Sequence, residues 1–321
     1  MNGLRSLQEN KSLRIASIDI GTNTILLLIA EVIDGKIIPL YNAQVIARLG
    51  KNVDATGFIQ KEAFEKVLKA LSEFKTIAEN FKVDKIIAIG TSALRDARNK
   101  VEFIDFIAQE TGIKIKVISG EEEARLTYLG AVSGIEPRFL SSKITVIDIG
   151  GGSTEIINGH GFEIKKFISL DIGTVRITEK FLKHSPPFEE EINEARNFIT
   201  QEFQKIEPDF DFKNSVLVGV AATVTTLSAY DLKLEIYDGE KVNMHEMTFE
   251  TIEKIYETFK KLSSDEIGKI PQISKGREDV IFAGILILRE FMKKFNFNRI
   301  ITSDRGVRYG VILDLLQRNY L

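Results

Sequence analysis

The chain has 321 residues, enough for about two domains of ordinary size, each with its own core. Hydrophobic residues make up 44% and charged residues 28%, which is the composition of a globular protein and excludes a disordered chain. The 43 lysines and arginines against 46 aspartates and glutamates give a net charge of −3, which argues against a dedicated nucleic-acid-binding protein.

Cysteine is absent, which excludes disulfides, thiolate metal sites and a cysteine nucleophile, and the three histidines are too scattered for a His-rich zinc site. The longest unbroken apolar stretch is the nonamer Val280–Leu288, whereas a membrane-spanning helix needs roughly 20 apolar residues. The first fourteen residues are polar and lack the apolar centre of a signal peptide. We therefore expect a cytoplasmic protein that binds neither a membrane nor a nucleic acid.

Many of the 23 glycines stand at the ends of short apolar runs. In chain order, these runs are Ile15–Gly21, Ile86–Gly90, Ile144–Gly150 and Val216–Gly219. Short runs of β-branched residues that end in glycine are typical of buried strands that enter tight turns. The first run is followed by Thr-Asn-Thr and the third by Gly-Gly-Ser-Thr, so a polar loop follows each of these strands.

Two features recur at the same spacing, which indicates a duplicated domain. The tetrapeptide IDIG occurs at 18–21 and at 147–150, an offset of 129 residues, and the same number separates Gly90 from Gly219. Chance is the alternative, because IDIG is short and apolar. The common order of the elements in the two halves favours duplication.

Each half continues with a second strand and a hairpin, since Asp34-Gly35 and Asn158-Gly159 separate apolar segments. Segments with the helical spacing of apolar residues follow, and strands mixed with helices in this way predict an α/β architecture. Residues 134–142, a polar segment that contains Pro137, are the candidate boundary between the halves. The predicted helices cover residues 61–80, 95–110, 188–206, 248–262 and 277–295.

The segment IDIGGGST admits two interpretations. A glycine-rich turn after a strand is typical of dinucleotide-binding folds, but those folds need a helix directly after the glycines. Here Ser153–Gly159 has the pattern of a strand and a turn, which argues against such a fold. Successive backbone N–H groups with serine and threonine hydroxyls form an anion-binding loop, and glycine lets the backbone approach a ligand closely. Two such loops across a cleft would grip a phosphate chain from both sides.

Asp19 and Asp148 each precede Ile-Gly at the start of the two loops. A carboxylate beside a phosphate site is unfavourable unless a cation lies between them, and Mg²⁺ prefers such oxygen ligands. Glu155 follows Asp148 by seven residues, across the glycine turn, so its carboxylate could return toward that of Asp148. A surface position at a strand edge is the alternative for Glu155.

A helix is predicted to begin at Ser119, because Ser119 and Glu122 have the spacing of a capping box. Three consecutive glutamates, residues 121–123, occupy its first turn, and compensation of the helix dipole would account for all of them. Neighbouring residues are about 100° apart on a helix and cannot all face one side. Either Glu121 or Glu123 could therefore enter the cleft.

Basic side chains should complement a phosphate ligand. Arg95 follows the strand-ending Gly90 by five residues and could reach back past the end of that strand. Arg277 precedes an apolar helix, and Arg305 and Arg308 lie near the C-terminus. For each arginine, a solvated or salt-bridged surface position is the alternative.

Six segments, in this order, resemble the exopolyphosphatase/guanosine pentaphosphate phosphohydrolase family: SIDIGTNT, GTSALRDA, ISGEEEARL, VIDIGGGSTE, SLDIGTVR and ITSDRGVRYGVIL. That family belongs to the actin/Hsp70/sugar-kinase superfamily. The resemblance implies an α/β protein with two duplicated ribonuclease-H-like domains of the actin-like ATPase type and an active site in the cleft between them. We assign residues 1–133 and 306–321 to the first domain, with the C-terminal helix packed back, and residues 134–305 to the second.

The resemblance also implies which residues form the site. Glu123 corresponds to the residue that activates the attacking water, and Arg95 to a basic residue that contacts phosphate, so both are predicted to be catalytic. Asp148 and Glu155 match metal-binding positions, Asp19 is expected to help through a water, and the cofactor would be Mg²⁺ or Mn²⁺. The predicted phosphate-binding residues are Gly21, Thr22, Asn23, Thr24, Gly150, Gly151, Gly152, Ser153, Thr154 and Arg277.

By this resemblance the substrate is linear inorganic polyphosphate, which loses its terminal phosphate, or pppGpp, and a homodimer is possible. An ATP-dependent kinase of the same superfamily and a weakly catalytic protein that binds an alarmone or polyphosphate are the alternatives. The family usually has a Gly-Gly-Thr core where this chain has Ala221-Ala222-Thr223, and some relatives carry a basic residue where it has Leu26. Both departures favour polyphosphate over pppGpp.

Overall fold

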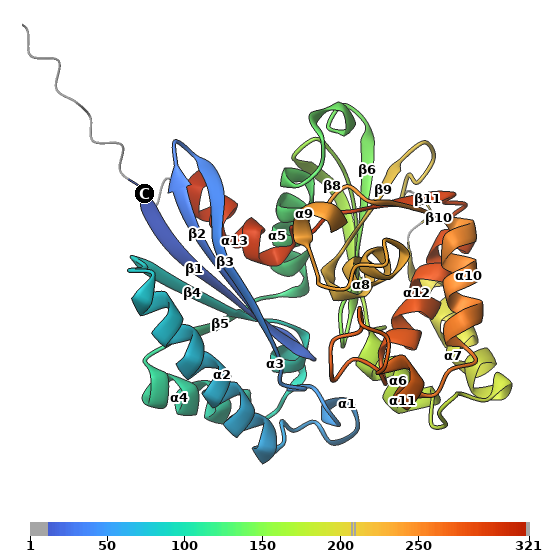
Figure 1. Cartoon of the computed structure of the whole chain (residues 1–321), viewed down its shortest axis with the longest axis horizontal. Helices are drawn as coiled ribbons and strands as arrows, with labels where there is room; N and C mark the ends of the chain where they lie inside the picture. Colours follow the sequence, from blue (N-terminus) through green and yellow to red (C-terminus); the bar gives the residue numbers. More distant parts are fainter. Residues whose placement is uncertain (1–11, 207, 209, 319–321) are drawn as a thin grey trace, which may run out of the picture.

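Two mixed β-sheets with helices around them make up the protein in the computed structural model, which describes residues 12–206, 208 and 210–318. Figure 1 shows the first sheet on the left, in blue and cyan, and the second on the right, with helices α5 (Gly120–Ser133) and α13 (Val307–Gln317) between them. This arrangement confirms the predicted α/β class and the two-part organisation.

The first half alternates strands and helices around a five-stranded sheet of order β3-β2-β1-β4-β5. The first three strands form an antiparallel meander, and the last two run parallel to the first. In chain order its elements are β1 (Leu13–Ile20), β2 (Thr24–Ile33), β3 (Lys36–Ile46), α1 (Val53–Thr56), α2 (Lys61–Asn80), β4 (Lys85–Gly90), α3 (Ser92–Asp96), α4 (Lys100–Thr111) and β5 (Ile115–Val117).

The second half contains a six-stranded sheet of order β10-β11-β9-β6-β7-β8. Its largest core cluster lies between this sheet and the apolar helix that the run at Val280–Leu288 predicts. Its elements are η1 (Pro137–Phe139), β6 (Lys143–Ile149), β7 (Thr154–His160), β8 (Glu163–Leu170), α6 (Thr174–Phe181), α7 (Glu189–Glu202), η2 (Phe203–Lys205), β9 (Val216–Val220), α8 (Ala221–Asp231), α9 (Gly239–Val242), β10 (Glu246–Thr248), α10 (Phe249–Phe259), α11 (Ser264–Ile267), α12 (Ile281–Lys294) and β11 (Arg299–Thr302).

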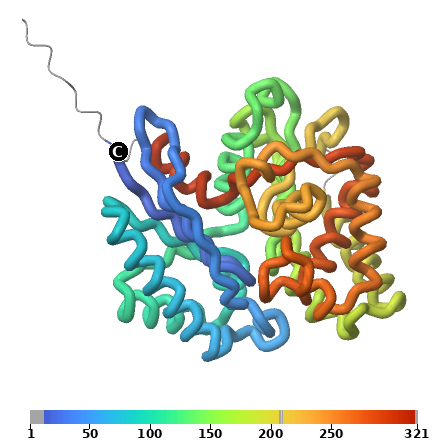
Figure 2. Tube along the Cα trace, viewed as in Figure 1, coloured from blue at the N-terminus to red at the C-terminus, as the bar shows by residue number. Residues whose placement is uncertain are grey.

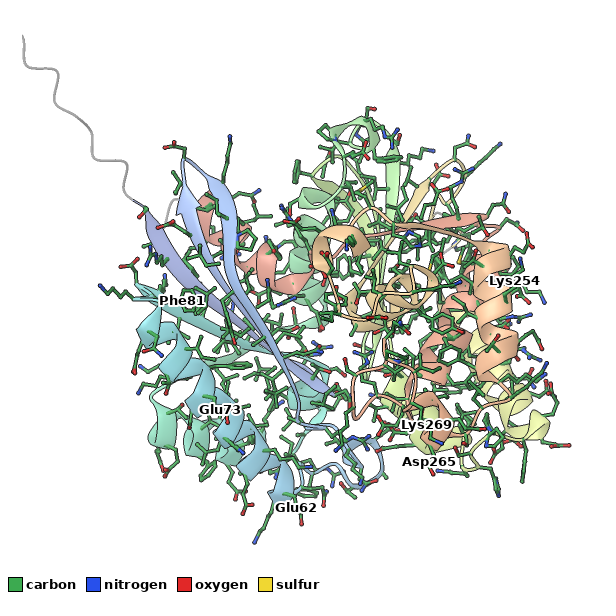
Figure 3. The ribbon with its side chains drawn as sticks, viewed as in Figure 1. Glu62, Glu73, Phe81, Lys254, Asp265 and Lys269 are labelled. Atoms are coloured by element: carbon green, nitrogen blue, oxygen red, sulfur yellow. The ribbon has the colours of Figure 1, made fainter. Side chains whose placement is uncertain are left out.

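The amphipathic helices predicted from apolar spacing lie against the sheets with their charged faces outward. On α2, Val67 and Phe74 are buried in the core, whereas Glu62 and Glu73 are exposed (Figure 3). The helix predicted over residues 95–110 is divided into α3 and α4, because the backbone is extended at Ala97 (φ −71°, ψ 130°). In the part of the chain that the structure describes, every helix is too short or too polar to span a membrane.

The repeated spacing in the sequence corresponds to a repeated pairing of strands. Asp19 lies opposite Leu26 in the β1–β2 pair, and Asp148 lies opposite Glu155 in the β6–β7 pair. Each member of the second pair follows its counterpart by the predicted offset of 129 residues. In each half, a third antiparallel strand and then a parallel strand complete the repeat.

Helices α5 and α13 lie between the two sheets, and their backbones approach each other very closely. A side chain on Gly130 of α5 would collide with the carbonyl of Gly306, and one on Gly310 of α13 would collide with the carbonyl of Leu126. α5 packs on the second sheet, and α13 packs on β1 and β2 of the first. The division into residues 1–133 with 306–321 and residues 134–305 stays a prediction, in which α5 ends the first segment of the first domain.

A second contact joins the two halves on the side of α1 and α6, where the tube of Figure 2 brings them together. Arg176 on α6 forms ion pairs with Asp54 of α1 and, at 3.0 Å, with Asp96 of α3. Its Nε also donates a 2.9 Å hydrogen bond to the carbonyl of Gly152. One guanidinium therefore ties the glycine loop of the second half to two helices of the first.

Candidate active site

A cavity of about 580 Å³ lies between the two halves. It is lined by the two glycine loops (residues 21–24 and 150–153), the start of α5, one face of α8 and the segment before α13. It brings together twelve of the predicted site residues: Asp19, Gly21, Thr22, Asn23, Thr24, Glu123, Asp148, Gly150, Gly151, Gly152, Ser153 and Arg277.

The other three predicted residues lie directly behind the lining of the cavity. Thr154 is buried, and its hydroxyl donates to the carbonyl of Ile172 at 2.6 Å. Glu155 is also buried, and Arg95 forms an ion pair with Glu123. Thr154 therefore supports the loop. Glu155 and Arg95 interact electrostatically with Glu123, which does line the cavity.

The two glycine loops have the same local geometry and touch each other. The amide of Gly21 donates to the carbonyl of Thr24 at 3.1 Å, and the amide of Gly150 donates to that of Ser153 at 3.0 Å. A side chain on Gly151 would lie 2.8 Å from Cβ of Thr22, so glycine is required for the loops to approach this closely. The two glycine loops therefore face each other, as expected, and their phosphate-binding role stays a prediction.

Asp148 and Glu155 face each other across β6 and β7, which brings their carboxylates to one side of the sheet. Thr127 donates to Asp148 at 3.2 Å, and Ser169 donates to Glu155 at 2.7 Å. Glu155 is 1% exposed, which rules out the alternative of a surface position.

The carboxyl groups of Asp19, Asp148 and Glu155 all have raised pKa values. Burial, with the nearby charges of Glu123 and Asp148, raises the pKa of Asp19 from 3.8 to about 7. Burial and Glu123 likewise raise the pKa of Asp148 to about 7. The pKa of Glu155 is raised well above its ordinary value, chiefly by burial and then by the charges of Glu123 and Asp148. Neighbouring carboxylates with raised pKa values are typical of a site that holds a cation or handles a proton.

The oxygen donors fit a hard divalent cation such as Mg²⁺ or Mn²⁺. Oδ1 of Asp19 is buried and lacks a hydrogen-bond partner within the described chain. Mg²⁺ usually keeps several waters and binds one or two carboxylates together with substrate phosphates. No group of three or more His, Cys, Asp or Glu residues in the described ranges could hold a metal ion by itself. The metal-binding roles of Asp19, Asp148 and Glu155 therefore stay a prediction, in which the substrate completes the coordination.

Helix α5 presents Glu123 to the cavity and leaves Glu121 in solvent. The Ser119 hydroxyl accepts a 3.1 Å hydrogen bond from the amide of Glu122, so the predicted N-cap is present. The side chain of Glu122 does not fold back; it pairs with Lys116 at 2.5 Å. Glu123 is 8% exposed, so the helix orientation selects it over Glu121 as the group that enters the cleft.

Arg95 holds Glu123 in place from behind. Its guanidinium pairs with the Glu123 carboxylate and donates to the carbonyl of Ile118 at 3.3 Å. Burial raises the pKa of Glu123, while the charge and hydrogen bond of Arg95 act in the opposite direction. The pair thus keeps a buried carboxylate oriented toward the cavity.

Arg277 is the buried cation of the site. It is 5% exposed, lines the cavity, and its Nε lacks a hydrogen-bond partner within the described residues. Burial lowers its pKa from 12.5 to about 10. A buried guanidinium with an unused donor is unfavourable in the free protein and suits an anionic ligand such as phosphate.

The far end of the cavity contains Leu234, Tyr237 and Asp304, for which the sequence alone indicated no role; Arg308, one of the basic side chains singled out in the sequence, also lines the cavity. Leu234 and Tyr237, from the segment between α8 and α9, make this end partly apolar. Asp304 accepts a hydrogen bond from the Tyr237 hydroxyl, and Arg308 donates to Asn42 at 3.0 Å. The motif ITSDRGVRYGVIL contains Asp304 and Arg308, but only the packing of α13 brings them to the cavity.

The raised pKa values predict how stability changes with pH. Because folding raises the pKa of Asp19 and Asp148 from 3.8 to about 7, these groups stabilise the fold at low pH. That contribution is lost as the pH rises from 3.8 through about 7. We expect the melting temperature of the metal-free protein to fall over this range, and MgCl₂ to raise it more at pH 8 than at pH 5. Scanning fluorimetry at the two pH values checks this.

The variant Asp148→Asn is the control for that measurement, since it removes one titrating group and keeps a similar shape. Its melting temperature should depend less on pH and on MgCl₂ than that of the wild type. Equal pH dependence in the two proteins would contradict the assignment.

Similarity to known proteins is extensive. Residues 28–319 match the Ppx/GppA phosphatase family. Exopolyphosphatase 2 of Mycobacterium tuberculosis is 31% identical over 319 residues, which cover 94% of this chain and 98% of that protein. The bifunctional 3-dehydroquinate synthase/phosphatase of Fusobacterium nucleatum is 39% identical over 318 residues. That alignment covers 95% of this chain, which spans only 47% of the Fusobacterium protein.

Solved structures are similar over the whole fold. The crystal structure of the Aquifex aeolicus member of the Ppx/GppA family superposes with a TM-score of 0.80 at 36% identity, covering 96% of this chain and 99% of that one. An exopolyphosphatase from Cytophaga hutchinsonii superposes with a TM-score of 0.88 at 28% identity, covering 95% and 98%.

Proposed function

Since this chain belongs to the Ppx/GppA phosphatase family and is a phosphoanhydride hydrolase, we propose that it is an exopolyphosphatase that releases orthophosphate from the end of linear polyphosphate. One observation carries the proposal: two facing glycine loops, the buried guanidinium of Arg277 and the carboxylate of Glu123 line one cavity. The names of the Mycobacterium and Cytophaga relatives support the choice of polyphosphate.

In the proposed mechanism, the loops bind the terminal phosphoryl group. Backbone N–H groups and hydroxyls of residues 21–24 and 150–153 surround it from two sides, and Arg277 donates to its oxygens. These groups are fixed before the substrate arrives, so they stabilise the charge that develops during transfer without reorganising. Phosphoryl transfer depends mainly on such positioning and charge stabilisation, and no covalent intermediate is required.

Glu123 is the proposed general base. Its carboxylate accepts a proton from the attacking water and orients that water in line with the P–O–P bond, while Arg95 keeps the carboxylate in place. Asp148 and Glu155, with Asp19 through a water, would hold Mg²⁺ or Mn²⁺. Such an ion, when bound, supplies neutralisation of charge on the phosphoryl oxygens.

Hydrolysis of pppGpp to ppGpp is a second candidate, and the far end of the cavity favours it. The side chains of Leu234 and Tyr237 line that end. A nucleoside would bury its base against such side chains, whereas a phosphate chain would gain no binding free energy from contact with them.

The test is phosphate release by the purified protein from tripolyphosphate, long-chain polyphosphate, pppGpp and ATP, each with Mg²⁺ and with Mn²⁺. We expect release from polyphosphate without any acceptor molecule. Phosphate transfer that requires an added sugar or carboxylate would indicate a kinase instead. Tight binding of (p)ppGpp or polyphosphate with no turnover would indicate a binding protein.

A further inference from the structure

The first residue of α8 has a backbone conformation that L-amino acids rarely adopt. Ala221 has φ +62°, in the left-handed region that glycine occupies without a steric penalty. Eight other described residues besides glycine have positive φ, but Ala221 alone among these nine lines the cavity. A strained residue at a functional cavity is an observation that points to a role in binding or catalysis.

The groups around Ala221 favour the binding of an anion. The N-terminus of α8 begins there, and no side chain of the described residues caps it. Its first N–H groups are therefore available to a ligand. The buried Arg277, with its unpartnered Nε, lines the same cavity and independently indicates a negatively charged ligand. An anionic group that enters from the phosphate loops therefore meets Ala221.

One face of α8 connects the two ends of the cavity. Ala222, Thr225 and Ala229 recur at helical spacing and all line it, from the phosphate loops at one end to Leu234 at the other. A ligand with a phosphate chain at the loops and a larger group at the apolar end must pass along this face. The methyl group of Ala221 lies at its start and adds volume, but no hydrogen-bonding group.

We propose that Ala221 determines substrate specificity by narrowing the cavity beside α8, so that a bare phosphate chain is accepted and a nucleoside 5′-polyphosphate is disfavoured. The inference rests on the proposed hydrolysis of polyphosphate. A phosphate that carries a ribose is bulkier than a terminal phosphate, and one methyl group is enough to discriminate between such ligands by about tenfold. In the left-handed conformation of Ala221, this methyl group occupies part of the cavity that would be empty if the residue were glycine.

The test compares wild type with Ala221→Gly, using tripolyphosphate and GTP as substrates. The ratio of kcat/KM for GTP to kcat/KM for tripolyphosphate should rise by about tenfold in the variant. Its melting temperature should also rise, by roughly 1–3 °C, because glycine relieves the left-handed conformation. The second readout reports the backbone strain independently of turnover.

Lys82→Gly is the matched control. Lys82 has φ +53° just after α2, is exposed, and is not part of the cavity lining. This variant should gain stability in the same way and leave the substrate ratio unchanged. If wild type hydrolyses tripolyphosphate but Ala221→Gly leaves the ratio unchanged, the inference on Ala221 is wrong. If neither protein releases phosphate from tripolyphosphate, the proposed function itself is wrong.

Discussion

Glu123→Gln is expected to abolish most phosphate release while the protein still binds its substrate. The loss of a general base lowers kcat by roughly 10²–10⁴-fold. Glutamine has the same shape and can still accept the hydrogen bond from Arg95, so the N-terminus of α5 and the cavity should keep their geometry. Removal of a buried carboxyl group should leave the affinity for tripolyphosphate equal or higher, because the site becomes less negative. Single-turnover phosphate release and calorimetric titration measure the two effects.

The neighbouring Glu121 provides the matched control. It lies on the same turn of α5 but is exposed, so Glu121→Gln removes a charge of the same type at nearly the same place. That variant should hydrolyse tripolyphosphate at close to the wild-type rate. Near wild-type turnover by Glu123→Gln, or an equal loss in both variants, would refute the role of Glu123 as the base.

Arg277→Met is expected to raise stability and to lower activity. The wild-type protein buries a guanidinium whose Nε lacks a hydrogen-bond partner in the part of the chain that the structure describes, and burial lowers its pKa to about 10, so the buried charge opposes folding. Methionine fills similar space without a charge, and the melting temperature should rise. The same substitution removes a fixed donor to the phosphoryl oxygens, which lowers kcat/KM by about 10²-fold. Thermal melts and steady-state kinetics with tripolyphosphate check both effects.

Arg289→Met should show the opposite behaviour. Arg289 lies on α12 outside the cavity and pairs with Glu253 at 2.6 Å and with Glu290 at 2.5 Å. Its removal takes the cation away from Glu253 and leaves buried Glu290 with Arg196 alone, so stability should fall while kcat/KM stays near the wild-type value. If Arg277→Met instead lowers the melting temperature and leaves kcat/KM unchanged, Arg277 has a structural role and does not contact the substrate.

Local sequence was sufficient to predict the two glycine loops. Gly21 and Gly150 end apolar runs with the same tetrapeptide, and the alternation of apolar strand and polar turn depends only on nearby residues. The duplication followed from spacing, and the register of β6 and β7 places Asp148 opposite Glu155 as the turn length implied. The division of the helix at Ala97 was missed, since helical periodicity continues across that residue.

Tertiary structure alone decided the properties that depend on distant neighbours. The sequence could not choose between Glu121 and Glu123, because only the packing of α5 on the second sheet turns one toward the cavity. It also could not tell that Arg277 is buried with an Nε that finds no hydrogen-bond partner among the described residues, or that Ala221 is left-handed. Strand endings and helix periods are encoded over a few adjacent residues, whereas burial, pKa and cavity shape arise from segments hundreds of residues apart in the chain.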